Sequence, residues 1–262
     1  MRRIVAIALA LAGLAGAQET RQDRGKRVVM EGLKALGGDA YLRMENRVES
    51  GRLYSFYREQ ISGLSVATIY TRYLAPVAGK IAVQERESFG LHQDEGAVLL
   101  TEEGGWEWNY HGVRTMEPDR YKTFVDSTLH NILYIMRQRL QEPGMSFYSE
   151  GADVYEREPV EMVDITDADN FTVTVYFSQI TKLPIRQVSR RRNEQFHDFD
   201  TEVTSFGKYR PVGGIQWPYD VWRERNGDKV FEMYSESVEI DKNLKSNLFT
   251  LPNNTKMMKK GK

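Results

Sequence analysis

The sequence predicts an α+β protein in which about ten antiparallel strands form one curled or closed sheet, wrapped partly around a central helix. Three observations support this fold class. Most of the chain after residue 46 alternates apolar and polar residues between short turn signals, which is typical of sequential strands. A long amphipathic segment, 118–140, interrupts that series. The chain also carries 4 Trp, 14 Tyr and 11 Phe, and aromatic side chains favour strands.

Residues 1–17 have the features of a secretory signal peptide. Arg2 and Arg3 precede an apolar stretch, and Ala15-Gly16-Ala17 matches the small-x-small pattern that signal peptidase recognises. The stretch is too short to span a bilayer, which takes about 20 apolar residues. The alternative, a buried N-terminal helix, is disfavoured by the two arginines at its start. We therefore expect cleavage after Ala17 and a periplasmic protein without a transmembrane anchor.

The composition limits the possible functions further. Charged residues make up 28% of the chain and apolar residues 40%, which is enough to bury a core. The formal charge of −1 argues against a dedicated nucleic-acid binder. Because the chain has no cysteine, neither disulfides nor thiol catalysis can contribute. We expect a monomer with a single domain over residues 18–255, followed by a basic tail at 256–262.

The pattern from residue 20 onward predicts one helix and then a series of strands. A helix over 20–36 places Val28, Val29 and Leu33 on one face and ends at Gly37-Gly38. The period then changes from 3.6 to two, with turn signals that include Ser62-Gly63. The predicted strands are 47–60, 64–74, 79–89, 97–101, 106–110, 171–177, 183–191, 198–209, 215–225 and 229–240. Asn226-Gly227 is the strongest short-range hairpin signal.

The segment 118–140 predicts one continuous amphipathic helix that begins near Pro118 and ends before Pro143-Gly144. Its apolar positions recur at helical spacing: Tyr121, Phe124, Val125, Leu129, Ile132, Leu133, Ile135, Met136 and Leu140. Because this apolar stripe is wide, the helix must lie against a large apolar surface.

Few residues are arranged for catalysis. The four histidines, His92, His111, His130 and His197, do not pair at metal-ligand spacing, so we expect no metal site. No Gly-x-Ser-x-Gly elbow and no phosphate-binding glycine loop is present, so we expect no cofactor and no enzymatic activity. Carboxylates are abundant, which leaves a carboxylate-dependent periplasmic hydrolase as the weaker alternative.

The tryptophans are more informative. Trp106 and Trp108 are two residues apart on a predicted strand and therefore share one face, and Trp217 shares a face with Ile215 and Tyr219. These side chains either fill a core or line an apolar cavity.

Several local segments, in their order along the chain, carry a family resemblance. They are Leu36-Gly37-Gly38 after the first helix, the strand after Pro76, Gly104-Gly105-Trp106-Glu107-Trp108, and the closing Leu248-Phe249-Thr250-Leu251-Pro252. Together with the signal peptide and the mid-chain helix, they resemble the lipoprotein-carrier superfamily (LolA/LolB-like). The resemblance implies a strongly curved, incomplete β-barrel with a helical plug or lid on its concave face. It also implies a cavity for lipid or lipoprotein acyl chains, as in outer-membrane lipoprotein sorting.

The resemblance and the apolar stripe together predict the residues that face such a cavity. They are Phe124, Leu129, Ile132, Leu133, Met136, Trp106, Trp108 and Trp217. One alternative is a permanently buried helix in an envelope interaction or sensor domain that fills its own core and binds protein partners. A large empty apolar cavity beneath 118–140 would favour the carrier, and a densely packed core the interaction domain. Two converging carboxylates in a polar cleft would favour the hydrolase.

Overall fold

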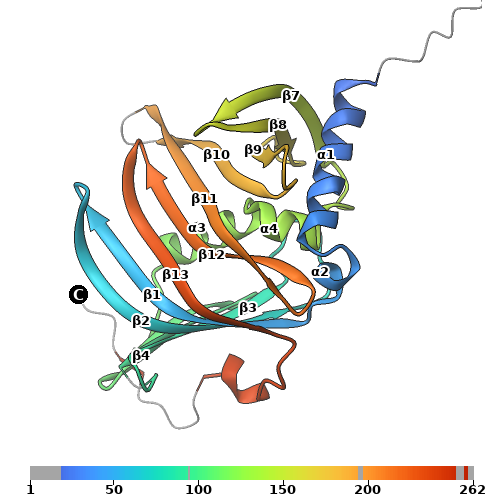
Figure 1. The fold of residues 1–262 in the computed structure, drawn as a ribbon. Helices are drawn as coiled ribbons and strands as arrows, with labels where there is room; N and C mark the ends of the chain where they lie inside the picture. Colours follow the sequence, from blue (N-terminus) through green and yellow to red (C-terminus); the bar gives the residue numbers. More distant parts are fainter. Residues whose placement is uncertain (1–18, 94, 194–196, 252–256, 259–262) are drawn as a thin grey trace, which may run out of the picture.

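The computed structural model describes residues 19–93, 95–193, 197–251 and 257–258, and these form one antiparallel sheet of thirteen strands with helices beside it (Figure 1). The strands are β1 (Asn46–Tyr57), β2 (Gln60–Tyr73), β3 (Val83–Phe89), β4 (Gly96–Thr101), β5 (Gly104–Asn109), β6 (Gly112–Thr115), β7 (Ser146–Tyr155), β8 (Glu158–Thr166), β9 (Thr172–Ser178), β10 (Pro184–Asn193), β11 (Asp198–Val212), β12 (Ile215–Arg225) and β13 (Asp228–Ile240). The helical segments are α1 (Arg21–Leu36), α2 (Asp39–Arg43), α3 (Pro118–Leu129), α4 (Ile132–Tyr134), a π-helical turn η1 (Ile135–Arg139) and a 3-10 turn η2 (Ser246–Phe249). The predicted signal peptide and most of the predicted tail lie outside the described residues.

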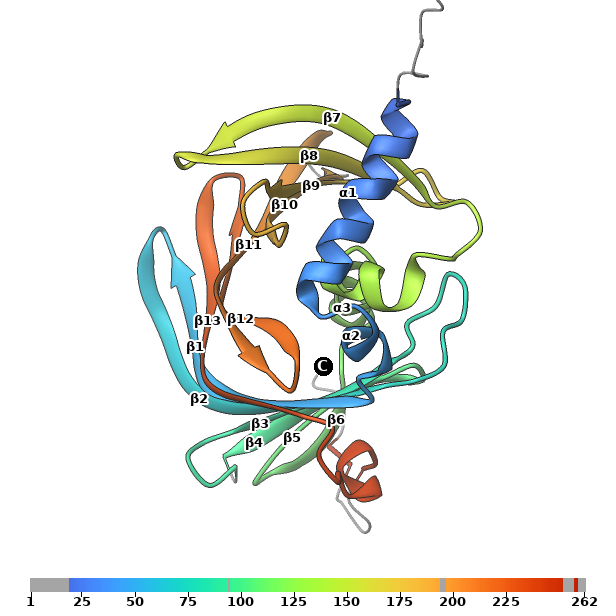
Figure 2. The same cartoon turned by 45° about the vertical axis from the view of Figure 1, so that its right-hand side comes forward.

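The sheet is strongly curved and does not close. Its strand order runs from β6 to β1 and then from β13 to β7, so the first and last strands are neighbours, and β6 and β7 stand at the two ends of the order. Val113 of β6 also bridges to Met257. Figure 2 shows the strands following a C-shaped path, with the helices in its opening. The predicted curved, incomplete barrel is therefore confirmed.

Two details of the strand prediction are wrong. The structure has thirteen strands in its described part rather than about ten, because the short β6 and the charge-rich β7 and β8 lack a clear alternation. The first hairpin turns at Arg58 and Glu59, which have φ of 50° and 63°, and not at Ser62-Gly63. Gly63 instead pairs with Ser55 within the β1–β2 ladder.

Helix α1 packs closely on one end of the sheet. Thr20 caps it by accepting a hydrogen bond from the Asp23 backbone N–H (3.1 Å), and Gly37 ends it at φ 133°. A Cβ at Gly25 would lie 2.9 Å from backbone atoms of Phe147 in β7, so only glycine permits this approach. The buried face of α1 joins α2, α4, η1 and strands β7–β9 and β11–β13 in the main hydrophobic core.

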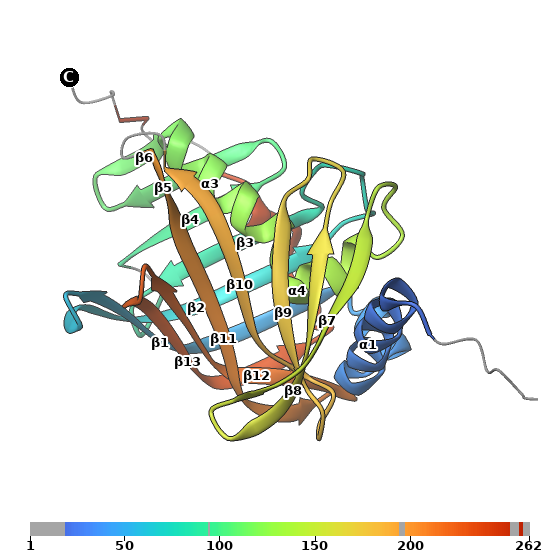
Figure 3. The same ribbon diagram turned by 90° about the horizontal axis from the view of Figure 1, so that it is seen from above.

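The predicted helix over 118–140 is not continuous. Helix α3 ends at Leu129, Asn131 is extended (φ −79°, ψ 128°), and its side chain accepts a hydrogen bond from the Leu133 N–H to start α4. Asparagine caps helices better than it continues them, because its side chain competes for backbone N–H groups. The break separates the apolar stripe into two parts with different surroundings. Viewed from above in Figure 3, α1 lies beside β7 and β8, and α3 lies towards the β4–β6 end of the sheet.

Candidate functional site

A cavity of about 400 Å³, open to solvent, lies between α3 and the concave face of the sheet. Strands β1–β4 and β11–β13 supply its wall, and α3 and α4 cover it. Its apolar lining comes from both sides, with Phe124 and Leu133 facing strand residues such as Val98, Val221 and Phe231. This volume is within the usual range for small-molecule sites, about 300–1,000 Å³.

The structure brings only some of the predicted cavity residues together. Phe124, Leu133 and Trp217 line this cavity. Leu129 packs beside it against Ile81, Val83 and Tyr134.

The other four lie elsewhere. Ile132 and Met136 are completely buried in the main core, although their neighbour Leu133 lines the cavity. Trp108 lines a separate surface hollow with Phe89 and Arg114. Trp106 is partly buried on β5 and lines neither this hollow nor the cavity.

One side of the cavity is charged, and sequence reasoning did not identify it. We call Arg47, Glu49, Thr71, Glu85 and Glu87 the polar wall; all five line the cavity. They come from three adjacent strands, β1, β2 and β3. Charged residues at alternate strand positions read as solvent-facing, and only the curvature of the sheet shows that this face is concave. Along β3, the alternation of Glu85 and Glu87 with Gln84 and Arg86 was the sequence signal that both glutamates share one face.

Arg47 and Glu49 form a buried ion pair with an N–O distance of 3.1 Å. The Arg47 guanidinium also donates hydrogen bonds to the Thr71 hydroxyl and to the Tyr73 hydroxyl, each 3.1 Å long, and lies 4.1 Å from the centre of the Trp217 ring. Ser235 donates a hydrogen bond to Glu49. This pair is therefore largely satisfied by the protein itself.

Glu85 and Glu87 are less well satisfied. The Thr71 hydroxyl donates a hydrogen bond to Glu85 (3.3 Å), and in the described part of the chain no ion pair within 4.0 Å involves either carboxylate. Burial raises the pKa of Glu85, although Arg47 opposes the shift. Burial and the neighbouring Glu85 raise the pKa of Glu87 to about 7, against the opposing charge of Arg223.

Trp217, which lines the same cavity, carries an unpaired donor. Trp217 is only 5% exposed, and its indole Nε1–H has no hydrogen-bond acceptor among the described residues. Most buried N–H groups in proteins are paired, because a buried unpaired donor is unfavourable by about 1–3 kcal/mol. The residues that line the cavity thus include one with an unpaired buried donor and two with weakly satisfied carboxylates.

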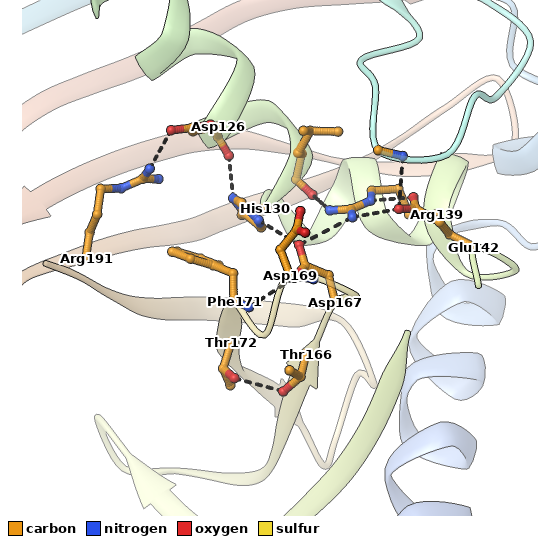
Figure 4. Close-up of polar contacts among 12 residues, drawn as sticks. Asp126, His130, Arg139, Glu142, Thr166, Asp167, Asp169, Phe171, Thr172 and Arg191 are labelled. Atoms are coloured by element: carbon orange, nitrogen blue, oxygen red, sulfur yellow. Dashed lines mark hydrogen bonds and ion pairs between the residues drawn. The ribbon is translucent and has the colours of Figure 1, made fainter. Parts of the chain in front are cut away.

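A polar cluster holds the C-terminal end of α3 in place (Figure 4). The His130 ring lies between two oxygens: Nδ1 is 2.7 Å from the Asp126 carbonyl and Nε2 is 3.0 Å from the Asp167 carboxylate in the β8–β9 turn. Burial lowers the pKa of His130, although Asp167 acts in the opposite direction. On the other side, Arg191 of β10 donates a hydrogen bond to the Asp126 carboxylate (2.7 Å).

Arg139 of η1 completes this cluster. Its buried guanidinium donates to the Leu129 carbonyl (2.7 Å) and pairs with Glu142 (2.7 Å) and Asp167 (3.4 Å). Burial would raise the pKa of Asp167, but the Phe171 N–H, His130 and Arg139 together lower it below its usual value. The C-terminal end of α3 is therefore joined to β10, the β8–β9 turn and η1 by polar contacts.

The described residues offer little for other chemistry. No group of three or more His, Cys, Asp or Glu among them could hold a metal ion. In the same part of the chain, no helix is long and apolar enough to cross a membrane.

Comparisons with solved structures show which known fold this chain shares. No family model matches the chain, and no curated protein matches it. Solved structures do. An outer membrane lipoprotein-sorting protein domain from Vibrio parahaemolyticus aligns with a TM-score of 0.61 at 9% identity, covering 87% of this chain and 97% of that one. A DUF1329 family protein from Desulfovibrio piger aligns with a TM-score of 0.58 at 11% identity, covering 88% and 97%.

A LolA superfamily protein from Nitrosomonas europaea aligns with a TM-score of 0.54 at 8% identity, covering 87% of this chain and 97% of that one. At these identities the likeness concerns the fold. It confirms the architecture that the local sequence segments resembled: the chain adopts the fold of the LolA superfamily and of outer membrane lipoprotein-sorting domains.

Proposed function

We propose that this chain is an exported periplasmic protein that binds the acyl chains of a lipid or lipoprotein in the cavity beneath α3. The cavity itself is the observation that carries the proposal, because it is open, partly apolar and covered by a helix. Each CH₂ group moved from water into such a site contributes about 0.8 kcal/mol, so a single alkyl chain supplies enough driving force for binding. Phe124, Leu133 and Trp217 are the predicted residues that would contact it.

The packing favours this function over a domain that fills its own core. The main core, which α1, α4, β7–β9 and β11–β13 enclose, is dense, with residues such as Ile132 and Met136 fully buried. Helix α3 is different, since none of its residues is fully buried and its inner face borders the cavity. An interaction domain without cargo has no need for that space.

Glu85 and Glu87 are the observation that supports the hydrolase as a second candidate. Glycosidases place two carboxylates on opposite sides of the bond that they cleave. Here the two carboxylates are side by side on the same face of β3, so both would approach a ligand from one direction. We therefore propose a binding role without catalysis.

The proposal is tested by the binding of Nile red, an uncharged apolar dye that fluoresces in apolar surroundings. The wild-type protein is expected to bind it with saturable fluorescence. Ser127→Trp places a large side chain on the cavity side of α3 and should weaken binding by about tenfold or more, because it fills the space that the dye would occupy.

Lys122→Trp is the matched control. Lys122 is an exposed residue of the same helix and does not line the cavity, so this variant should bind the dye like the wild type. Circular dichroism checks that both variants are folded. Equal binding by all three proteins, or no binding by the wild type, would contradict the proposal. Ile132 and Met136 are unsuitable probes, because a charge in the fully buried core would unfold the chain.

A further inference from the structure

We propose that the cavity selects amphiphiles whose head group carries a protonated amine, which Glu85 and Glu87 hold while the alkyl chain lies along the inner face of α3. This inference rests on the proposed function and specifies the chemical class of its ligand. It concerns the head group, whereas the proposed function concerns the apolar chain.

The first argument is the placement of the two carboxylates. Glu85 and Glu87 alternate along β3, so their side chains share the concave face with Val83. The polar wall therefore adjoins apolar surface within one cavity, as an amphiphilic ligand requires.

The second argument is that no neighbouring arginine forms an ion pair with Glu85 or Glu87 in the described structure. Arg47 forms an ion pair with Glu49, and Arg120 of α3 forms one with Glu107 of β5. Arg223 of β12 is exposed at the cavity and lies 5.5 Å from the centre of the Phe231 ring. Neither Glu85 nor Glu87 thus has a cationic partner within 4.0 Å among the described residues, and a ligand ammonium would supply one.

The third argument is independent of the carboxylates. The indole N–H of Trp217 is buried, belongs to a residue that lines the same cavity, and has no acceptor in the described structure. An ester, amide or phosphate oxygen on a ligand would accept its hydrogen bond. Head groups in which an amine lies close to such an oxygen satisfy both requirements, whereas a simple carboxylate would meet the repulsion of Glu85 and Glu87.

The electrostatics of the cavity agree with this assignment. The pKa of Glu87 is raised to about 7, because burial and Glu85 disfavour its charged form. The other charged groups that line the cavity are Arg47 and Glu49 of β1, Arg120 of α3 and Arg223 of β12. A bound ammonium would favour the ionised form of Glu87, so binding should strengthen as pH rises through 7.

Competition against Nile red tests the inference with three ligands of equal chain length, namely decylamine, decanol and decanoate. At pH 8, decylamine is expected to displace the dye at a concentration at least about tenfold lower than decanol, and decanoate should be the weakest. An alkylammonium resembles lysine, with a pKa of about 10.4, and stays charged. Lowering the pH from 8 to 6 should therefore weaken decylamine about tenfold, because only about a tenth of Glu87 remains ionised one unit below its pKa.

Glu87→Gln should abolish both the preference for the amine and its dependence on pH, and Glu85→Gln should reduce the preference. Glu103→Gln, which removes an exposed carboxylate in the β4–β5 turn, should change neither. The two variants and the wild-type pH series are separate measurements, so one misfolded variant leaves the inference testable.

The outcomes distinguish the two proposals. If the wild type binds Nile red but prefers decylamine no more than decanol, the inference is wrong and the proposed function stands. The same holds if the preference persists in both Glu85→Gln and Glu87→Gln. If the wild type binds neither Nile red nor decylamine in direct calorimetry, both proposals are wrong.

Discussion

At the scale of single residues, the polar wall shows how position in the fold changes a side chain's chemistry. Glu103 lies in an exposed turn, whereas Glu87 lies in the cavity and has its pKa raised to about 7. The cause is the loss of water around the carboxylate together with the charge of Glu85. Such groups are common at functional sites, because function and not stability keeps them there.

Glu87 should make the protein less stable as pH rises. Its folded-state pKa is above the usual 4.5, so the native state holds the proton more tightly than the unfolded chain between pH 4.5 and about 7. Each pKa unit corresponds to about 1.4 kcal/mol. Between pH 5 and pH 8 the wild type should therefore lose up to roughly 3 kcal/mol of unfolding free energy that Glu87→Gln retains.

Urea unfolding at pH 5, 6.5 and 8 measures this difference. The control is Glu103→Gln, whose stability should follow the wild type at every pH because that carboxylate is exposed. Parallel pH profiles for the wild type and Glu87→Gln would show that the Glu87 carboxyl is not perturbed by the cavity.

At the scale of elements, the helices differ in what they do. Helix α1 belongs to the permanent core, since four of its apolar residues, Val28, Val29, Leu33 and Leu36, are buried there. Helix α3 covers the cavity and is fixed at its C-terminal end by the cluster around His130, Asp167 and Arg139. Its N-terminal turns are held as well, because Arg120 pairs with Glu107 of β5 and the Tyr121 hydroxyl donates a hydrogen bond to the Thr101 carbonyl (2.6 Å).

The contact between α1 and β7 depends on Gly25. A Cβ there would lie 2.9 Å from the backbone carbonyl of Phe147 and from the backbone nitrogen of Ser149, and backbone atoms cannot move aside as side chains do. Gly25→Val should lower the unfolding free energy by about 1–3 kcal/mol, the usual effect of overpacking.

Lys26→Val is the comparison, because Lys26 is the next residue of α1 and is exposed. It should change stability by no more than about 0.5 kcal/mol. Thermal or urea unfolding measures both variants. If the two substitutions have equal effects, α1 does not pack on β7 as closely as the structure shows.

At the scale of the whole molecule, the sheet pairs its first strand in the sequence, β1, with its last, β13. β1 and β13 pair over nine residue positions at the centre of the strand order, and β1 also pairs with β2. The curvature that follows brings β3 opposite α3 and encloses the cavity. The two end strands of the sheet, β6 and β7, lie on either side of the opening that the helices occupy (Figure 2).

The N-terminal end of the chain should be removed on export. Expressed in a bacterial host, the protein is expected in the periplasm with a mass that begins at Gln18, because Ala15-Gly16-Ala17 supplies the small residues that signal peptidase needs. Ala17→Arg should block cleavage and retain residues 1–17. Intact-mass measurement distinguishes these results, and an unprocessed wild-type chain would contradict the prediction.

Much of the architecture could be predicted from local pattern. The spacing of Val28, Val29 and Leu33 predicted α1, alternation predicted most strands, and short turns predicted an antiparallel order. The break at Asn131 was missed because the apolar residues on both sides of it fit one helical stripe. Periodicity reports which residues share a face, and it does not report whether two halves of a stripe meet the same surface.

The candidate site was predicted in part for a related reason. Phe124, Leu133 and Trp217 were identified as large apolar residues, whereas Glu85 and Glu87 alternate with polar neighbours and read as exposed. The sequence by itself determined most of the elements and their order, because these depend on contacts between near neighbours. Only the tertiary structure decided which face of β3 is concave and which residues it meets. The pairing of strands as distant in the sequence as β1 and β13 joins the two halves of the curved sheet, and it places Glu87 and Trp217 in the same cavity.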